Sequence, residues 1–151
     1  MHLRLDDLSG PEIAALLREH LDDMHAITPP ESVHAMDLDA LRRADITFWT
    51  VWENDELLGC GALKALNASS GEVKSMRTSN AHRGRGVARR VLAEIERVAR
   101  SRAYDTLFLE TGSMPEFLPA RTLYETAGFD YCGPFGDYRP DPNSVFMCKR
   151  L

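Results

Sequence analysis

Two glycines and two arginines lie between a strand-like segment, residues 72–78, and the most regular amphipathic pattern of the chain, residues 87–102. At a helix start the first backbone N–H groups have no partner within the helix, and the helix dipole adds partial positive charge. Gly84 and Gly86 allow unusual backbone angles and close approach of a ligand. The junction therefore predicts a pyrophosphate site, although a plain strand-to-helix loop with solvated arginines has the same composition.

Hydrophobic periodicity predicts an alternating order of strands and helices, β-α-(α)-β-β-β-α-β-α-β-β. Ser9 and Glu12 resemble a capping box at the first helix, and Gly128 suits a left-handed helix end. Strands are predicted at residues 2–5, 46–53, 57–66, 72–78, 106–110, 129–131 and 145–149, and helices at residues 13–25, 38–43, 87–102 and 120–127.

Composition excludes several classes of protein. The 151 residues, 44% of them hydrophobic, fit one globular domain spanning residues 1–151. A net charge of −5 argues against a nucleic-acid partner and is compatible with a cationic substrate. No apolar run approaches the about 20 residues of a membrane span. Three scattered cysteines without metal-ligand spacing, and no signal peptide, predict a cytoplasmic protein without a metal.

Three motif families compete for the glycine loop. A P-loop requires Gly-Lys-Ser/Thr, which is missing, and a dinucleotide fingerprint requires a third small residue where Arg89 stands. The pattern Arg83-x-x-Gly86-x-Ala88 resembles the Arg/Gln-x-x-Gly-x-Gly/Ala loop of the GNAT family of N-acetyltransferases. Residues 123–129, Leu-Tyr-Glu-Thr-Ala-Gly-Phe, are similar to the Leu-Tyr-Glu-x-x-Gly-Phe element of the same family. The resemblance covers nearly the whole chain.

The resemblance implies an α/β (α+β) GNAT fold, with a mixed, mostly antiparallel twisted sheet of about seven strands that is flanked by helices and splayed between strands 4 and 5. It implies acetyl-CoA as cosubstrate, with the main-chain amide of Met76 polarising the acetyl carbonyl and Arg77 and Thr78 lining the pantetheine arm. Phe117 departs from the family, where an asparagine often touches the coenzyme. The residues expected to hold the coenzyme phosphates are Arg83, Gly84, Arg85, Gly86, Val87 and Ala88.

Acetyl transfer also requires an acid and a base. Tyr124 is the candidate general acid, because a phenol with pKa near 10 is protonated at neutral pH; the alternative is a packed aromatic whose hydroxyl binds a carbonyl. Glu72, four residues before Met76, is the candidate base, as in some family members. The alternative for Glu72 is a solvated edge residue. Glu110 competes as base or as a binder of a cationic substrate, and His34 is expected to meet substrate.

These residues predict direct transfer of acetyl to a small-molecule or peptide amine in a ternary complex. Three alternatives remain: a coenzyme-binding regulatory module without catalysis, a different acyl donor such as succinyl-CoA with Arg121 as its cationic partner, and a dinucleotide-dependent oxidoreductase. Residues 24–38 and 133–143 are expected to line the acceptor pocket, and acidic residues there are compatible with a polyamine, an aminoglycoside or a basic peptide terminus. The apolar strand at residues 145–147 is compatible with a homodimer, and an interior strand of the sheet would have the same composition.

Overall fold

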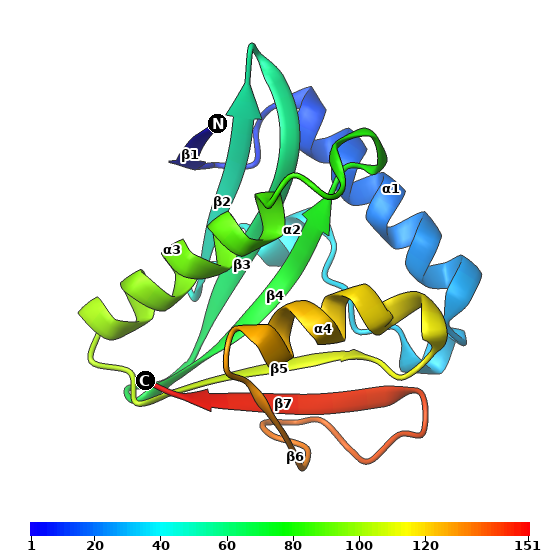
Figure 1. Ribbon diagram of the computed structural model, residues 1–151, viewed down its shortest axis with the longest axis vertical. Coiled ribbons are helices and arrows are strands. Elements are labelled where there is room, and N and C mark those ends of the chain that lie inside the picture. Colours follow the sequence, from blue (N-terminus) through cyan, green and yellow to red (C-terminus); the bar gives the residue numbers. More distant parts are fainter.

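Seven strands form one sheet in the order β1-β2-β3-β4-β5-β7-β6, in a computed structural model that describes residues 1–151 (Figure 1). All neighbours are antiparallel except β4 and β5, which are parallel. The mixed sheet of the sequence-based expectation is confirmed. The strands are β1 (His2–Leu5), β2 (Ile46–Glu53), β3 (Glu56–Asn67), β4 (Ser70–Thr78), β5 (Thr106–Gly112), β6 (Asp130–Cys132) and β7 (Ser144–Arg150).

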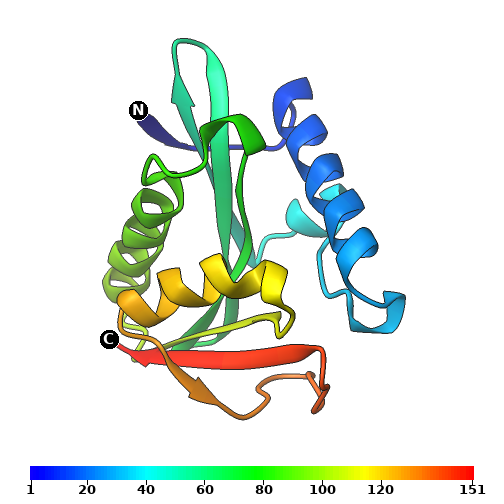
Figure 2. The same cartoon turned by 45° about the vertical axis from the view of Figure 1, so that its right-hand side comes forward.

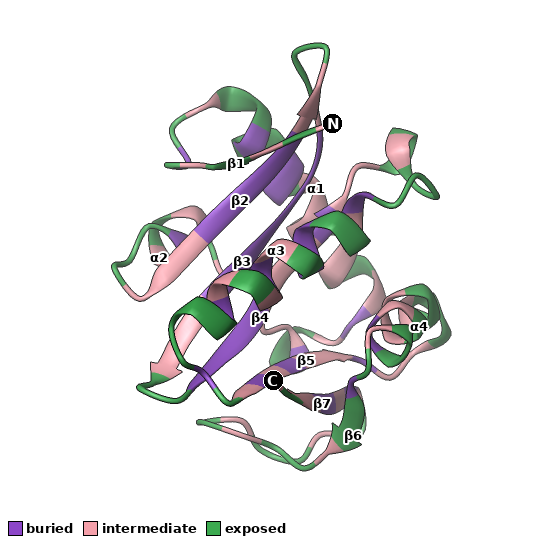
Figure 3. Cartoon of the chain, turned by 60° about the vertical axis from the view of Figure 1, so that its left-hand side comes forward, coloured by how far each residue is buried: buried purple, intermediate pink, exposed green.

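Helices cover both faces of the sheet (Figure 2). The apolar sides of α3 and α4 close one buried cluster, and those of α1 and α2 close a second cluster on the other face. Figure 3 shows the burial concentrated on the strands, while the outer side of α3 is exposed. None of the helices is both long and apolar enough to span a membrane. The helices are α1 (Pro11–Ile27), α2 (Leu38–Leu41), α3 (Val87–Ser101) and α4 (Leu118–Thr126), with short 3-10 turns at Pro30–Ser32, Asn80–His82 and Pro115–Phe117.

The parallel pair β4–β5 separates after three residues. Pairing joins Ser70 to Thr106, Gly71 to Leu107 and Glu72 to Phe108, and then stops, although β4 continues to Thr78. In Figure 1, β5 and β7 run away from the direction of β2–β4. The splay between the fourth and fifth strands is thereby confirmed, and it leaves one edge of β4 without a strand partner.

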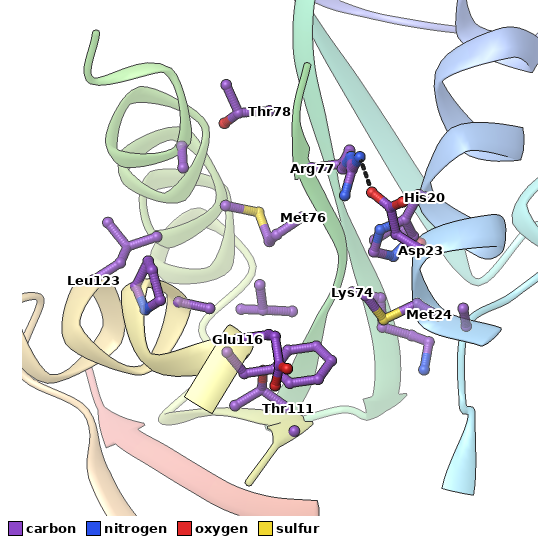
Figure 4. A pocket seen from close by; sticks show the side chains of 18 of the residues that line it. His20, Asp23, Met24, Lys74, Met76, Arg77, Thr78, Thr111, Glu116 and Leu123 are labelled. Carbon is purple, nitrogen blue, oxygen red and sulfur yellow. Dashed lines mark hydrogen bonds and ion pairs between the residues drawn. The ribbon is translucent and has the colours of Figure 1, made fainter. Parts of the chain in front are cut away.

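A bulge in β4 redirects its side chains. Ser75 has a positive φ of 55°, and the register with β3 shifts there, so that Cys60 opposes Arg77 while Ala62 opposes Lys74. One inserted residue breaks the period of two along a strand. As a result Met76 packs against the α3 cluster, whereas Lys74 and Arg77 both point to the α1 side (Figure 4).

Gly61 of β3 accommodates this bulge. A β-carbon at Gly61 would come within 2.5 Å of the sulfur of Met76 and within 2.5 Å of a methyl group of Val91 in α3. We expect Gly61→Ala to lower the free energy of unfolding by about 1–3 kcal/mol through overpacking, as measured by urea denaturation. Gly133→Ala is the matched control, since a β-carbon there meets nothing within 4 Å. Equal stability of the two variants would contradict the close packing of β4 against α3.

One expectation is corrected. Ser9 does not cap α1: Gly10 occupies the N-cap position without a side-chain bond, and the Ser9 hydroxyl donates instead to Asp7 in a local turn. The apolar strand at residues 145–147 is an interior strand of the sheet, because β7 lies between β5 and β6. Its hydrophobicity is explained by an interior position in the sheet.

Candidate active site

A cavity of about 1220 Å³ lies where β4 and β5 separate (Figure 4). Its walls come from α1, residues 32–35, β4, the glycine loop, the start of α3, β5 and the region of α4. The structure therefore brings together residues from both halves of the chain. The lining includes every site residue predicted from sequence except Arg85, namely His34, Glu72, Met76, Arg77, Thr78, Arg83, Gly84, Gly86, Val87, Ala88, Glu110 and Tyr124.

The glycine loop forms one end of the cavity. Gly84 and Gly86 have φ values of 78° and 81°, in the left-handed region that favours glycine, and Gly86 is the N-cap of α3. A β-carbon on either glycine would meet nothing within 4 Å, so the space above the loop is open. With Arg83 exposed beside it, the loop presents unpaired N–H groups and positive charge to this space.

Arg85 points away from the cavity. Its guanidinium donates to Glu53 at 2.6 Å and meets a ring nitrogen of His82 at 3.1 Å. Glu53 ends β2, so this ion pair fastens the glycine loop to the β2–β3 turn. Arg83 lines the cavity, whereas Arg85 is paired with Glu53 outside it. The sequence alone does not distinguish the two arginines.

Tyr124 of α4 lies deep in the cavity and only 6% of its surface is exposed. Its ring packs edge-on against Phe129, and its hydroxyl forms no hydrogen bond with another group of the chain. Burial, with a smaller contribution from the negative charge of Glu110, raises the pKa of Tyr124. The phenol is therefore protonated throughout the physiological range, and no carbonyl occupies its hydroxyl.

Glu72 is buried within the sheet, with 3% of its surface exposed, so the alternative of a solvated edge residue is wrong. Its carboxylate accepts hydrogen bonds from the ammonium of Lys74 at 3.1 Å and from the hydroxyl of Tyr138 at 2.6 Å. Lys74 also donates to the Tyr138 oxygen at 3.0 Å. The three groups form a closed polar network beside the cavity.

The place where β4 and β5 separate is called the fork. Glu110 lies on β5, across the fork from Glu72 on β4. Its carboxylate accepts a hydrogen bond from the Ser144 hydroxyl at 2.7 Å. Burial raises the pKa of Glu110, while the Ser144 hydrogen bond and the charges of His34 and Lys74 act in the opposite direction. The fork thus holds two carboxylates on the face opposite the α3 cluster, since Leu107 and Leu109 of β5 face that cluster.

Arg77 ties β4 to the wall formed by α1. Its guanidinium donates to Glu19 at 2.6 Å and also to Asp23 (Figure 4). His20 lies beside it, and burial, followed by the charge of Arg77, lowers the pKa of His20 to about 4. His20 is therefore neutral at pH 7, and the C-terminal half of α1 is held against the sheet by a buried cation.

Several residues of the site are missed by sequence reasoning. Lys74 and Tyr138 carry no motif, although Tyr138 falls within residues 133–143, which are expected to line the acceptor pocket. Phe117 lies against Gly112, where a β-carbon would collide with its ring. The guanidinium of Arg121, the expected partner of a succinyl group, instead donates to the carbonyls of Gly112 and Met114.

Comparison with known proteins agrees with this geometry. The sequence model of the acetyltransferase (GNAT) family matches residues 13–129. The chain is 56% identical over 151 residues to the uncharacterized N-acetyltransferase YsnE of Bacillus subtilis (strain 168), covering 100% of both chains. It is 46% identical over 149 residues to the uncharacterized N-acetyltransferase YedL of Escherichia coli (strain K12), covering 99% of this chain and 94% of that one.

A solved structure is similar along nearly the whole chain. The putative acyl-CoA N-acyltransferase from Klebsiella pneumoniae subsp. pneumoniae MGH 78578 superposes with a TM-score of 0.79 at 28% identity, covering 99% of this chain and 97% of that chain. The overall arrangement of strands and helices is thus shared with this putative acyl-CoA N-acyltransferase.

Proposed function

The chain belongs to the GNAT family of acetyltransferases, and from this premise we propose that it moves an acetyl group from acetyl-CoA to a primary amine by direct transfer in a ternary complex. Residues 1–151 act as a single acetyltransferase domain. The observation that carries the proposal is the fork itself. It places a glycine loop at a helix start, an unpaired edge of β4, the buried carboxylate of Glu72 and the half-buried carboxylate of Glu110 around one cavity.

The residues around the cavity fit coenzyme A. The open space above Gly84 and Gly86 is suited to a pyrophosphate, which the N–H groups at the start of α3 and the charge of Arg83 would hold. Beyond Glu72 the unpaired edge of β4 offers backbone groups to the extended pantetheine arm, past Thr78 and Met76. The bulge at Ser75 turns Met76 toward α3, so its amide is the proposed donor to the acetyl carbonyl.

When bound, acetyl-CoA supplies the electrophile: the acceptor nitrogen forms a bond to the acetyl carbonyl carbon while the carbon–sulfur bond breaks and sulfur keeps the electron pair. Tyr124 gives its phenolic proton to that sulfur, and its raised pKa makes it a proton donor that never ionises in advance. Glu72 accepts the proton that the ammonium of the acceptor must lose before attack. The second proton, which the nitrogen loses as the amide forms, returns to the Tyr124 phenolate. Glu110 binds the ammonium on the other side of the fork.

The coenzyme site is tested by titration calorimetry with CoA. We expect Arg83→Ala to weaken binding about 10-fold to 100-fold, because a charge-assisted hydrogen bond contributes about 1.5–3 kcal/mol. Arg85→Ala is the matched control: it removes an equal charge from the same loop, but its guanidinium is held by Glu53 outside the cavity. Gly86→Glu adds a negative charge and should abolish binding. Binding that is equally strong in all variants would contradict a phosphate site at this loop.

Two other functions would give different results in assays. A coenzyme-binding module without catalysis would bind CoA as described but release no thiol from acetyl-CoA with any amine. A preference for succinyl-CoA would require a cation near the acyl group, and the engagement of Arg121 with two carbonyls speaks against it. A comparison of acetyl-CoA with succinyl-CoA as donor distinguishes an enzyme that prefers succinyl-CoA from the proposed acetyltransferase.

A further inference from the structure

The ammonium of Lys74 has one donor that no protein group uses. An ammonium has three N–H donors, and those of Lys74 reach only the Glu72 carboxylate and the Tyr138 hydroxyl. The side chain is 10% exposed and lines the cavity (Figure 4). A nearly buried ammonium with a free donor beside a substrate cavity requires an acceptor atom from water or from the substrate.

The bulge in β4 accounts for the position of this lysine. Because the alternation is interrupted at Ser75, Lys74 and Arg77 lie on the same face of β4, toward α1, which is the proposed acceptor side of the fork. Met76 faces α3, which is the proposed coenzyme side. Two cations therefore line the acceptor side of the fork. Arg77 is paired with Glu19 and Asp23, so Lys74 is the cation that keeps a free donor for a ligand.

The segments that wall the acceptor side contact one another. The loop at residues 32–35 is joined to the loop before β7 by a hydrogen bond from Ser32 to Asp141 at 2.6 Å and by edge-to-face contact of His34 with Tyr138, whose ring centroids are 5.0 Å apart. The third wall, α1, is fastened by Arg77. These contacts connect the walls of the acceptor side to one another.

We propose that the acceptor is a free α-amino acid and that Lys74 binds its carboxylate. This inference rests on the proposed acetyltransferase function. In an α-amino acid the amino group and the carboxylate are attached to one carbon, and the cavity offers a matching pair of groups close together. Glu72 pairs with Phe108, so Lys74 and Glu110, each two residues farther along its strand, lie at corresponding positions on the two sides of the cavity. Glu110 faces the amino group, and Lys74 faces the carboxylate.

The test compares each of the common amino acids with its own primary amide, which keeps the amino group and loses the negative charge. Release of free CoA thiol is measured with acetyl-CoA as donor. For the accepted amino acids we expect kcat/KM to be at least about 10-fold higher for the acid than for the amide. In Lys74→Met this preference should fall to within about two-fold through a rise in KM, and Lys74→Arg should restore part of it.

Two controls separate carboxylate binding from a change in Glu72, which Lys74 also touches. Calorimetric titration of the CoA-bound protein with the N-acetyl amino acid measures binding without catalysis, and Lys74→Met should weaken it by the same factor. Lys64→Met, on the neighbouring strand and outside the cavity, should leave the preference unchanged. Thermal unfolding of each variant shows that it is folded.

Other outcomes overturn the inference. Amides or simple amines that are acetylated as well as amino acids would show that no carboxylate is bound. The same conclusion follows if another amine is acetylated while no amino acid is. A protein that fails to bind CoA would contradict the proposed function itself, and the choice of acceptor would fall with it.

Discussion

Replacing Tyr124 by phenylalanine is expected to lower kcat by about 100-fold to 10,000-fold, the range of a lost general acid. The substitution removes one oxygen and keeps the ring that packs against Phe129. The departing sulfur would then lose the proton donor that lines the cavity and would have to take its proton from water. Steady-state kinetics with the preferred acceptor measure the effect.

Binding of CoA distinguishes catalysis from packing in this variant. Because the hydroxyl of Tyr124 forms no hydrogen bond with the chain, the loss of the oxygen should leave both thermal stability and the CoA dissociation constant nearly unchanged. A variant with full kcat, or one with a much weaker affinity for CoA, would assign Tyr124 a structural role. The burial that raises its pKa also means that the wild-type rate should not decline at mildly alkaline pH through ionisation of Tyr124.

Glu72→Gln is expected to lower kcat/KM for an ammonium acceptor by about 100-fold or more, because it removes the proposed proton acceptor. The amide keeps the shape of the side chain beside Lys74 and Tyr138. Tyr138→Phe is the matched control, since it removes a hydrogen bond to Glu72 without removing the carboxylate; its effect should be far smaller. Steady-state kinetics at pH values below and above neutral measure kcat/KM of the Glu72→Gln and Tyr138→Phe variants and of the wild type.

The pH profile separates Glu72 from Glu110. Because burial raises the pKa of Glu110, a rate that depends on its carboxylate form decreases as the pH falls through that raised value. If Glu72 is the base, Glu110→Gln should raise KM, remove this component and leave a slower decline toward acid pH. If Glu110→Gln instead abolishes kcat while Glu72→Gln does not, the roles of the two carboxylates are reversed.

Much of the fold could be predicted because its signals are local. The helix after the glycine loop was expected at residues 87–102 and is found at Val87–Ser101, since its apolar period of 3.6 is uninterrupted. Gly84, Gly86 and Gly128 have a positive φ, a conformation that glycine adopts without steric cost, at a helix start or a helix end. Such turns depend on the residues next to them in the sequence. The capping of α1 was predicted wrongly because Asp7 competes for the Ser9 hydroxyl, a choice between two equally local partners.

The sequence by itself determined the strand and helix order, the glycine loop and the family, because periodicity and short motifs are written in adjacent residues. Only the tertiary structure decided which groups meet at the acceptor side. Glu72 and Tyr138 are 66 positions apart, and they meet because the sheet places β7 beside β5. The bulge at Ser75 then turned Lys74 and Arg77 to one face, a local deviation stabilised by packing of Met76 against Gly61 and α3 rather than by any residue preference at Ser75 itself.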